Sequence, residues 1–362
     1  MYRKAKQMRH EGLRNRLVFS TVAVLAVTAI GSASPPRSAI AGAERLATVS
    51  PGPWVPTSSV LVNQVGVWAA TNQLSHGDLK PITGSGSTLD VEVGDLLNSF
   101  GTTSKGPLGL ATASDGEGSS QAFVVSPSTS QVFSLAGSFT NLDGSAVLPD
   151  DHWGYLADQG FSESASLDVV NLQTREVYPI TSLPGFSPAL SAVAACTGGN
   201  IVVATDNGDN ELDIFSGVGT DPTNPTQTTV PVGSDPVAVA CSRGLAYVAD
   251  EESSTLTVVD VATASVSSTI SVGASPDAVS VSSKRIYVAN RGSDNLSIIR
   301  VGSTSVAKTV AVGVSPDGIA QSGDVYVTDY ASDAVTVLSP GGSLVNTFVG
   351  IPSPEAISVV QA

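Results

Sequence analysis

The chain has 362 residues, of which 41% are hydrophobic, 14% charged and 5% aromatic, and its formal net charge is −15. The mean hydropathy of +0.20 excludes a disordered acidic tail, because disorder requires low hydrophobicity. The acidic balance argues against nucleic-acid binding, which needs a basic patch to displace counterions from phosphates.

The first 33 residues have the order of a secretory signal peptide. An apolar stretch at 17–30 is followed by small residues at 31–33 and again at 39–43. This stretch is shorter than the roughly 20 residues that a membrane-spanning helix needs, so we expect cleavage and no transmembrane segment afterwards. The bases before it are Arg3, Lys4, Lys6, Arg9, Arg14 and Arg16. Residues 1–33 hold these six bases and one acid, so their removal moves the charge from −15 to about −20.

Residues 34–58 contain five prolines and many small residues, which predicts a flexible lead-in. Residues 59–362 are then expected to form the folded part. Together with the signal peptide, this places the protein outside the cell or on the extracellular face of the cell envelope.

The C-terminal half repeats one pattern about every 40 residues. Each copy has a Val-Gly-x-x-Pro segment, then Tyr-Val followed two residues later by Asp or Asn, then a run that alternates apolar and small polar residues. Weaker copies lie upstream. The prolines taken as the start of each copy are Pro107, Pro149, Pro188, Pro236, Pro276, Pro316 and Pro354.

The copy that begins at Pro276 contains four short runs with the two-residue alternation of strands, at 278–281, 284–289, 296–300 and 306–312. Four strands per 40 residues is typical of a propeller blade. We therefore predict an all-β, seven-bladed β-propeller with four antiparallel strands per blade. Its last blade is closed by both termini, with the C-terminal strand innermost. Six or eight blades also fit, because residues 50–148 repeat poorly.

The sequences Tyr326-Val327-Thr328-Asp329 and Tyr287-Val288-Ala289-Asn290 resemble the YVTN-type β-propeller repeat family. The resemblance covers about residues 107–362 and is strongest at 236–340. It implies a secreted or cell-surface propeller, often seven-bladed and frequently without known activity. More distant similarity extends to NHL-type binding propellers, streptogramin-lyase-like enzymes and lactonase-type propellers.

An acid directly follows four of the prolines. If these prolines begin innermost strands, ring closure brings the acids together at the mouth of the central channel as a collar for a ligand or cation. Ca²⁺ is the metal that such a collar suits, because it takes several oxygen ligands. The alternative is solvated turn residues. The four acids are Asp150, Asp277, Asp317 and Glu355.

Residues 206–213 form the densest acidic loop of the chain. The loop invites a calcium interpretation, but it lacks the spacing and the closing Glu of an EF-hand. Its counterpart in neighbouring copies is an ordinary turn, which is the favoured interpretation.

Cys196 and Cys241 are the only cysteines and occupy matching positions in adjacent copies. Matching positions on neighbouring inner strands can reach the separation of a disulfide, and exported chains tolerate one. Two buried free thiols are the alternative.

No catalytic residues are predicted. His76 and His152 lie in separate, poorly repeated regions, and no Gly-x-Ser-x-Gly elbow is present. The sequence therefore favours a non-catalytic, exported propeller that binds an envelope protein or a polysaccharide through its loop face. The alternative is a metal-dependent enzyme similar to lactonases or lyases, with an acidic site at the channel mouth. A subunit of a surface coat is a third hypothesis.

Overall fold

The computed structural model describes residues 66–72, 77–81, 89–91, 96–102, 108–114, 120–126, 131–150, 152–159, 166–180, 189–196 and 198–360. All described residues belong to one compact unit, residues 55–362. The predicted signal peptide and the whole predicted lead-in lie outside the described residues.

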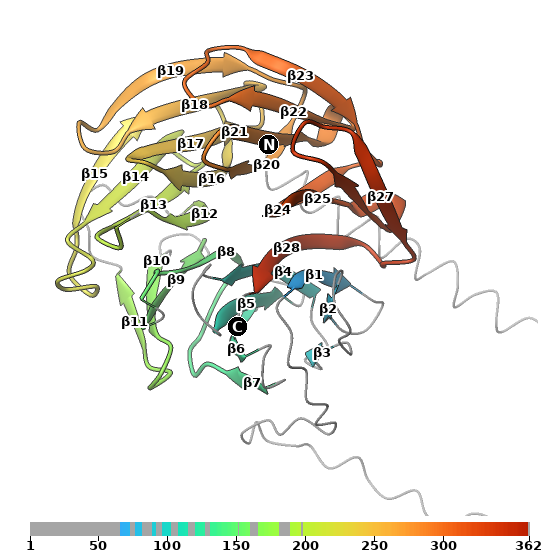
Figure 1. Cartoon of the computed structure of the whole chain (residues 1–362). Helices are drawn as coiled ribbons and strands as arrows, with labels where there is room; N and C mark the ends of the chain where they lie inside the picture. Colours follow the sequence, from blue (N-terminus) through green and yellow to red (C-terminus); the bar gives the residue numbers. More distant parts are fainter. Residues whose placement is uncertain are drawn as a thin grey trace, which may run out of the picture. The chain divides into compact units, whose positions relative to one another are not determined.

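The described part of the chain is all-β, with 28 strands in seven four-stranded antiparallel sheets. Figure 1 shows these sheets arranged around a common centre. The innermost strands contact one another in the closed order β4, β8, β12, β16, β20, β24, β28 and back to β4. Within the described residues no helix is long and apolar enough to cross a membrane.

Six blades each consist of four consecutive strands, numbered here in chain order. Blade 1 has β4 (Leu96–Thr102), β5 (Gly109–Ser114), β6 (Ser120–Ser126) and β7 (Gln131–Ser134). Blade 2 has β8 (Leu142–Val147), β9 (Trp153–Asp158), β10 (Ser166–Asn171) and β11 (Val177–Ile180). Blade 3 has β12 (Leu190–Ala195), β13 (Ile201–Asp206), β14 (Glu211–Ser216) and β15 (Thr226–Pro231).

The clearest sequence repeats form the remaining three. Blade 4 has β16 (Pro236–Ser242), β17 (Leu245–Asp250), β18 (Thr255–Asp260) and β19 (Ser265–Ser271). Blade 5 has β20 (Pro276–Val281), β21 (Arg285–Asn290), β22 (Asn295–Arg300) and β23 (Val306–Ala311). Blade 6 has β24 (Pro316–Ser322), β25 (Asp324–Asp329), β26 (Ala334–Leu338) and β27 (Leu344–Val349). Two short 3-10 helices, η1 (Arg291–Ser293) and η2 (Tyr330–Ser332), follow β21 and β25.

The predicted count of seven blades is corrected as follows. Six blades are continuous in the chain, and the remaining four-stranded sheet is composite. In it, β28 (Pro354–Val360) pairs antiparallel with β1 (Gly66–Asn72), followed by β2 (Gly77–Pro81) and β3 (Leu89–Val91). The two ends of the described chain thus meet in one sheet, and β28 is its innermost strand, next to β24 and β4.

Two of the predicted blade starts were wrong. The inner strand of blade 1 begins at Leu96, ahead of Pro107, and that of blade 2 begins at Leu142, so that Pro149 lies in the connection between β8 and β9. Leu142 occupies in blade 2 the paired position that Pro236 occupies in blade 4, opposite the last residue of the second strand. An aliphatic side chain can therefore replace proline here, and proline spacing alone misplaces the N-terminal blades.

Each hydrophobic cluster is shared by two neighbouring blades. Val203 and Leu212 of blade 3 pack with Val248 of blade 4, and Tyr287 of blade 5 packs with Val327 of blade 6. The second strands are therefore buried on both faces, as in the run of five buried residues that ends β17. Stability in such an array is the sum of contacts between neighbours, and ring closure leaves no end blade exposed.

A buried polar residue ends the second strand of five blades, and we call it the clamp residue. In blades 4 and 6 it is an aspartate that binds the Val-Gly segment before the inner strand. Asp250 Oδ1 accepts the Gly233 N–H at 3.2 Å, and Asp329 Oδ1 accepts the Gly313 N–H at 2.9 Å. The five clamp residues are Asp158, Asp206, Asp250, Asn290 and Asp329, all at most 3% exposed.

The glycine of the Val-Gly segment is required by this close approach. A Cβ atom on Gly233 would lie 2.5 Å from Cγ of Asp250, and one on Gly313 would lie 2.5 Å from Cγ of Asp329. The Tyr-Val motif and the Val-Gly motif are therefore two halves of one structural contact.

We expect Asp329→Ala to lower the free energy of unfolding by about 2 kcal/mol, because it leaves a buried N–H without its acceptor. Asp329→Asn should be tolerated, because blade 5 uses Asn290 at this position and its Oδ1 accepts the Gly273 N–H at 3.1 Å. Urea unfolding at pH 7 measures both. Equal losses for the two variants would show that the hydrogen bond is not the stabilising element.

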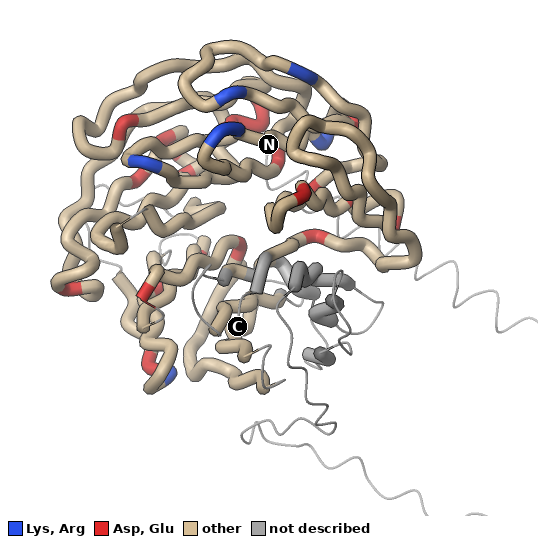
Figure 2. The backbone as a smooth tube through the Cα atoms, in the orientation of Figure 1, with Lys and Arg blue, Asp and Glu red and all other residues tan. Residues whose placement is uncertain are grey.

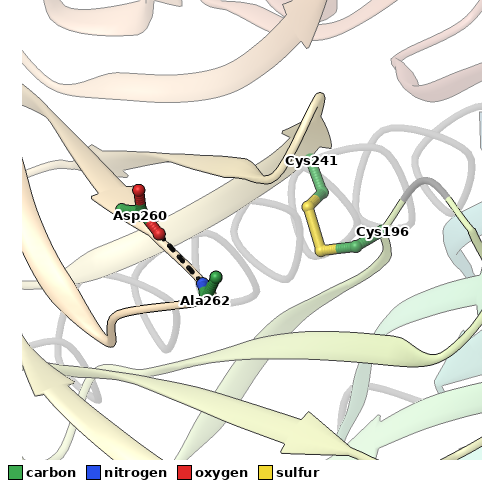
Figure 3. Close-up of a disulfide and its surroundings, with 4 residues drawn as sticks. All are labelled: Cys196, Cys241, Asp260 and Ala262. Carbon is green, nitrogen blue, oxygen red and sulfur yellow. Dashed lines mark hydrogen bonds between the residues drawn. A yellow bond between two sulfur atoms is a disulfide. The ribbon is translucent and has the colours of Figure 1, made fainter.

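Cys196 and Cys241 form a disulfide in the structure, with their Cα atoms 4.9 Å apart. The bond joins blades 3 and 4: Cys196 follows the last residue of β12, and Cys241 lies near the end of β16 (Figure 3). It closes a loop with a sequence separation of 45 residues. A loop of this size stabilises a fold by about 4 kcal/mol in the chain-entropy estimate.

The double variant Cys196→Ala/Cys241→Ala should therefore unfold at a temperature several degrees lower than the oxidised wild type. Reduction of the wild type should produce a similar shift and leave the variant unchanged. Scanning calorimetry with and without reductant measures both effects. An identical melting temperature for the oxidised protein and the double variant would refute the stabilising role.

Candidate functional site

The face on which the inner strands begin carries the candidate site, and we call it the start face. Because strands alternate in direction, the turn between the second and third strands of each blade lies on the same face. Backbone bonds connect the two regions: Glu251 N–H donates to the Asp235 carbonyl at 2.8 Å, and Arg291 N–H to the Ser275 carbonyl at 2.8 Å.

Every inner strand contains a register shift close to its start, opposite the end of the second strand. Such a β-bulge places one extra residue in the inner strand and redirects its neighbours. We call the extra residue the bulge position. Among residues with described side chains it is Asp143, Ser191, Val237, Asp277, Asp317 or Glu355, from blade 2 round to the composite sheet.

Three of the four predicted collar residues therefore share this position, on the adjacent strands β20, β24 and β28. The fourth does not. Asp150 is exposed in the connection after β8, at the opposite end of the inner strand, where its Oδ1 accepts the His152 N–H at 3.0 Å. The proposed collar is corrected accordingly, because Asp150 belongs to a local turn on the other face.

Asp143 is the acid of blade 2 that proline spacing missed. The sequence signal was Leu142-Asp143-Gly144, which parallels Pro316-Asp317-Gly318 with Leu in place of Pro. Asp143 Oδ2 accepts a hydrogen bond of 2.5 Å from Nε2 of Gln159, which is buried. Gln159 in turn accepts a hydrogen bond from the Asn141 side chain. Asp143 is therefore held in place by the residue that follows the clamp.

Asp277 has a cationic neighbour, Arg291, at the position equivalent to Gln159. Arg291 Nη1 lies 3.5 Å from Asp277 Oδ2, and the two side chains are 18% and 11% exposed. Arg291 follows the clamp residue Asn290, as Gln159 follows Asp158. Each of these two bulge acids is thus paired with a different side chain from the same structural position.

The residue after the clamp differs in each blade where a clamp residue is present. Its backbone is fixed, because its N–H donates to the carbonyl just before the inner strand. Its side chain is free to vary in charge, size and aromatic character. From blade 2 to blade 6 the residues are Gln159, Asn207, Glu251, Arg291 and Tyr330.

Acidic groups also surround the start of blade 4. Asp235, before β16, is 9% exposed and Oδ1 of its side chain has no hydrogen-bond partner among the described residues. The pKa of Asp235 is raised to about 6, first by burial and then by the charges of Glu251 and Glu252. Figure 2 shows acidic positions, in red, on several of the innermost strands.

The acidic loop 206–213 is organised by its own backbone. Asp206 Oδ1 accepts the N–H groups of Gly208 at 2.9 Å and Asp209 at 3.2 Å, which is the geometry of a turn. Within the described ranges, no group of three His, Cys, Asp or Glu side chains is placed to hold a metal ion. His76 lies outside the described residues.

Asp235→Asn should raise the melting temperature at pH 8 and leave it almost unchanged near pH 4. The folded pKa lies above the unfolded value, so the stability contribution of the protonated form is complete below about pH 4 and is lost as pH rises through about 6. Thermal unfolding at both pH values measures this. A variant no more stable than wild type at pH 8 would contradict it.

A comparison of the sequence with known protein families and with curated proteins finds no match. Solved structures share the fold. A functionally unknown protein from Desulfotomaculum acetoxidans has a TM-score of 0.67 at 12% identity, covering 81% of this chain and 99% of that one. The periplasmic gluconolactonase PpgL of Pseudomonas aeruginosa has a TM-score of 0.64 at 15% identity, with coverages of 82% and 99%. A putative 6-phosphogluconolactonase from Bacteroides fragilis has a TM-score of 0.63 at 15% identity, with coverages of 84% and 100%. This chain is a β-propeller.

Proposed function

We propose that this protein is an exported, non-catalytic β-propeller that binds an envelope protein or polysaccharide through its start face. The observation that carries the proposal is the division of that face into repeated and varied positions. The clamp residue is Asp or Asn in five blades. From blade to blade, the side chains at the bulge position and at the position after the clamp vary among acidic, amide, hydroxyl, basic and aliphatic types. Positions held by a fixed backbone and free to vary are suited to recognition by loops on a rigid scaffold.

Two further features support this proposal. The signal-peptide pattern of residues 1–33 predicts export, and a disulfide between blades 3 and 4 suits an oxidising compartment. The resemblance to YVTN-type repeats, strongest at 236–340, points to the same location.

The test compares two variants with the same change in charge. Asp277→Asn/Asp317→Asn/Glu355→Gln removes three acids from the start face. Asp221→Asn/Asp260→Asn/Asp324→Asn removes three acids from the opposite end of the blades. Each variant, with residues 1–33 removed, is immobilised and exposed to envelope extract and, separately, to purified cell-wall polysaccharide.

We expect a component retained by wild type to be lost from the start-face variant and kept by the control. Retention should weaken with salt if the partner is cationic. Equal retention by both variants would remove the start face from the proposal, and no retained component in either arm would refute the binding function.

A second candidate is lactone hydrolysis. The observation that favours it is the likeness in fold to two lactonase structures, together with three acids on adjacent inner strands. Hydrolysis of δ-gluconolactone is measured with and without added Ca²⁺ or Mg²⁺. The binding proposal expects the rate of buffer alone. Metal-dependent turnover that is lost in the start-face variant and kept in the control would replace the binding proposal with the enzymatic one.

A further inference from the structure

Blades 2 and 3 carry an aspartate where blades 4, 5 and 6 carry a hydroxyl. The third residue of the third strand is Thr257 in blade 4, Ser297 in blade 5 and Thr336 in blade 6, two residues after the residue that pairs with the clamp. The same register places Asp168 in blade 2 and Asp213 in blade 3. The pairs are therefore equivalent in position, and only their chemistry differs.

In the hydroxyl blades the contact is a hydrogen bond that stabilises the clamp. Thr257 Oγ1 donates to Asp250 Oδ2 at 2.7 Å, and Thr336 Oγ1 donates to Asp329 Oδ2 at 2.5 Å. In blade 5 the amide of the clamp is the donor, from Asn290 Nδ2 to Ser297 Oγ at 2.9 Å. In each of these pairs one hydrogen atom lies between the two side chains. It lies between two oxygens in blades 4 and 6 and between nitrogen and oxygen in blade 5.

Blade 3 has two carboxyl groups at these positions. Asp206 and Asp213 are 2% and 1% exposed. Asp213 Oδ1 accepts the Gln227 Nε2–H at 2.9 Å, whereas its buried Oδ2 has no partner among the described residues. A fully ionised pair would hold two negative charges in the interior, with no hydroxyl donor between them.

Blade 2 repeats the arrangement. Asp158 and Asp168 are 3% and 4% exposed. The carboxylate of Asp158 accepts the Thr140 N–H, with distances of 3.2 and 3.1 Å to its two oxygens, and Asp168 Oδ1 accepts the Ser166 hydroxyl at 2.6 Å. The acid–acid pair therefore recurs, with its own surrounding donors, in the adjacent blade.

We propose that each pair binds one shared proton, which takes the place of the hydroxyl hydrogen in blades 4 and 6 and makes the acid pairs of blades 2 and 3 sensitive to pH. Two buried carboxyl groups at these neighbouring positions of one sheet cannot both ionise readily, so one keeps its proton well above its usual pH. The protonated carboxyl then donates as threonine does in blades 4 and 6.

The surroundings of both pairs favour protonation. The pKa of Asp213 is raised to about 7, first by burial and then by the charges of Asp206, Glu211 and Asp209, against the Gln227 hydrogen bond. The pKa of Asp168 is raised to about 6, first by burial and then by the charge of Asp158, against the Ser166 hydrogen bond. The charged groups that act on Asp168 and Asp213 in these two blades are acids.

Loss of the proton would act on the start face. Asp206 holds the turn at Gly208 and Asp209, and Asp158 holds Thr140, which lies just before the inner strand that carries Asp143. Repulsion within a pair weakens these bonds. The recognition surface of blades 2 and 3 is therefore expected to be better ordered in mildly acidic than in alkaline conditions.

The test exchanges the two chemistries in both directions. Asp168→Thr/Asp213→Thr installs the hydroxyl of the other blades, and Thr336→Asp builds an acid pair in blade 6. Unfolding by urea is followed from pH 4.5 to 8.5 for wild type and both variants. An intact pair should raise the unfolding equilibrium constant by up to about tenfold per pH unit between its unfolded and folded pKa values.

We expect the pH dependence of unfolding of the double variant to correspond to the release of up to two fewer protons than in wild type. That of Thr336→Asp should correspond to the release of up to one more proton. Amide exchange at Asp206 and Asp213 should also quicken on going from pH 5 to 8, beyond the intrinsic pH effect, in wild type and not in the double variant. This second measurement applies if Thr336→Asp fails to fold.

Parallel pH slopes for wild type and the double variant would overturn the proposal. The proposal would also be overturned if added Ca²⁺ removed the instability of wild type at alkaline pH and had no such effect on the double variant. A cation would then occupy the pairs in place of the proton. Retention of envelope components is independent of these readouts, so failure here leaves the proposed function standing.

Discussion

The ring depends on a buried acceptor that fixes the connection between blades. In blades 4, 5 and 6 the clamp residue binds the glycine N–H of the Val-Gly segment, and this glycine admits no Cβ atom. The contact joins the end of a second strand to the entry of an inner strand. Because it lies inside the protein, a missing acceptor leaves a buried donor unsatisfied, which is more costly than the bond itself is stabilising.

The same contact also gives several buried acids of this chain a structural role. A carboxylate is the strongest acceptor available for backbone N–H groups, but its burial is unfavourable unless donors surround it. Asp250 has three donors, from Gly233, Thr255 and Thr257. Aspartate is therefore retained at the clamp for its geometry, although burial raises its pKa.

Much of the fold followed from periodicity, and the failures have a common physical cause. The copies at 236–340 keep both halves of the clamp and the proline, so their strands could be located from sequence. In blades 1 and 2 leucine replaces the proline, since the position needs an apolar residue more than a fixed φ angle. Proline spacing consequently points to Asp150 and misses Asp143, one strand-length away on the opposite face.

The contacts between blades were less accessible, because they depend on register. The match between Cys196 and Cys241 was visible as an equivalence of position. The acid pairs were not recognised, since the loop before Asp168 is longer than the turn before Asp213 and hides the common offset. Only the pairing of strands shows that both acids stand where Thr257 stands in blade 4.

In the proposed function, a repeated clamp and a varied bulge separate stability from recognition within the blades that have a clamp residue. Substitution at Asp277 or Glu355 alters the start face without touching the clamp, whereas substitution at Asp250 or Asp329 disturbs the connection itself. Blades 2 and 3 depart from this separation, because their clamp residues face a second acid and their stability depends on protonation. A binding surface that spans both kinds of blade can therefore combine a rigid part with a part that responds to pH.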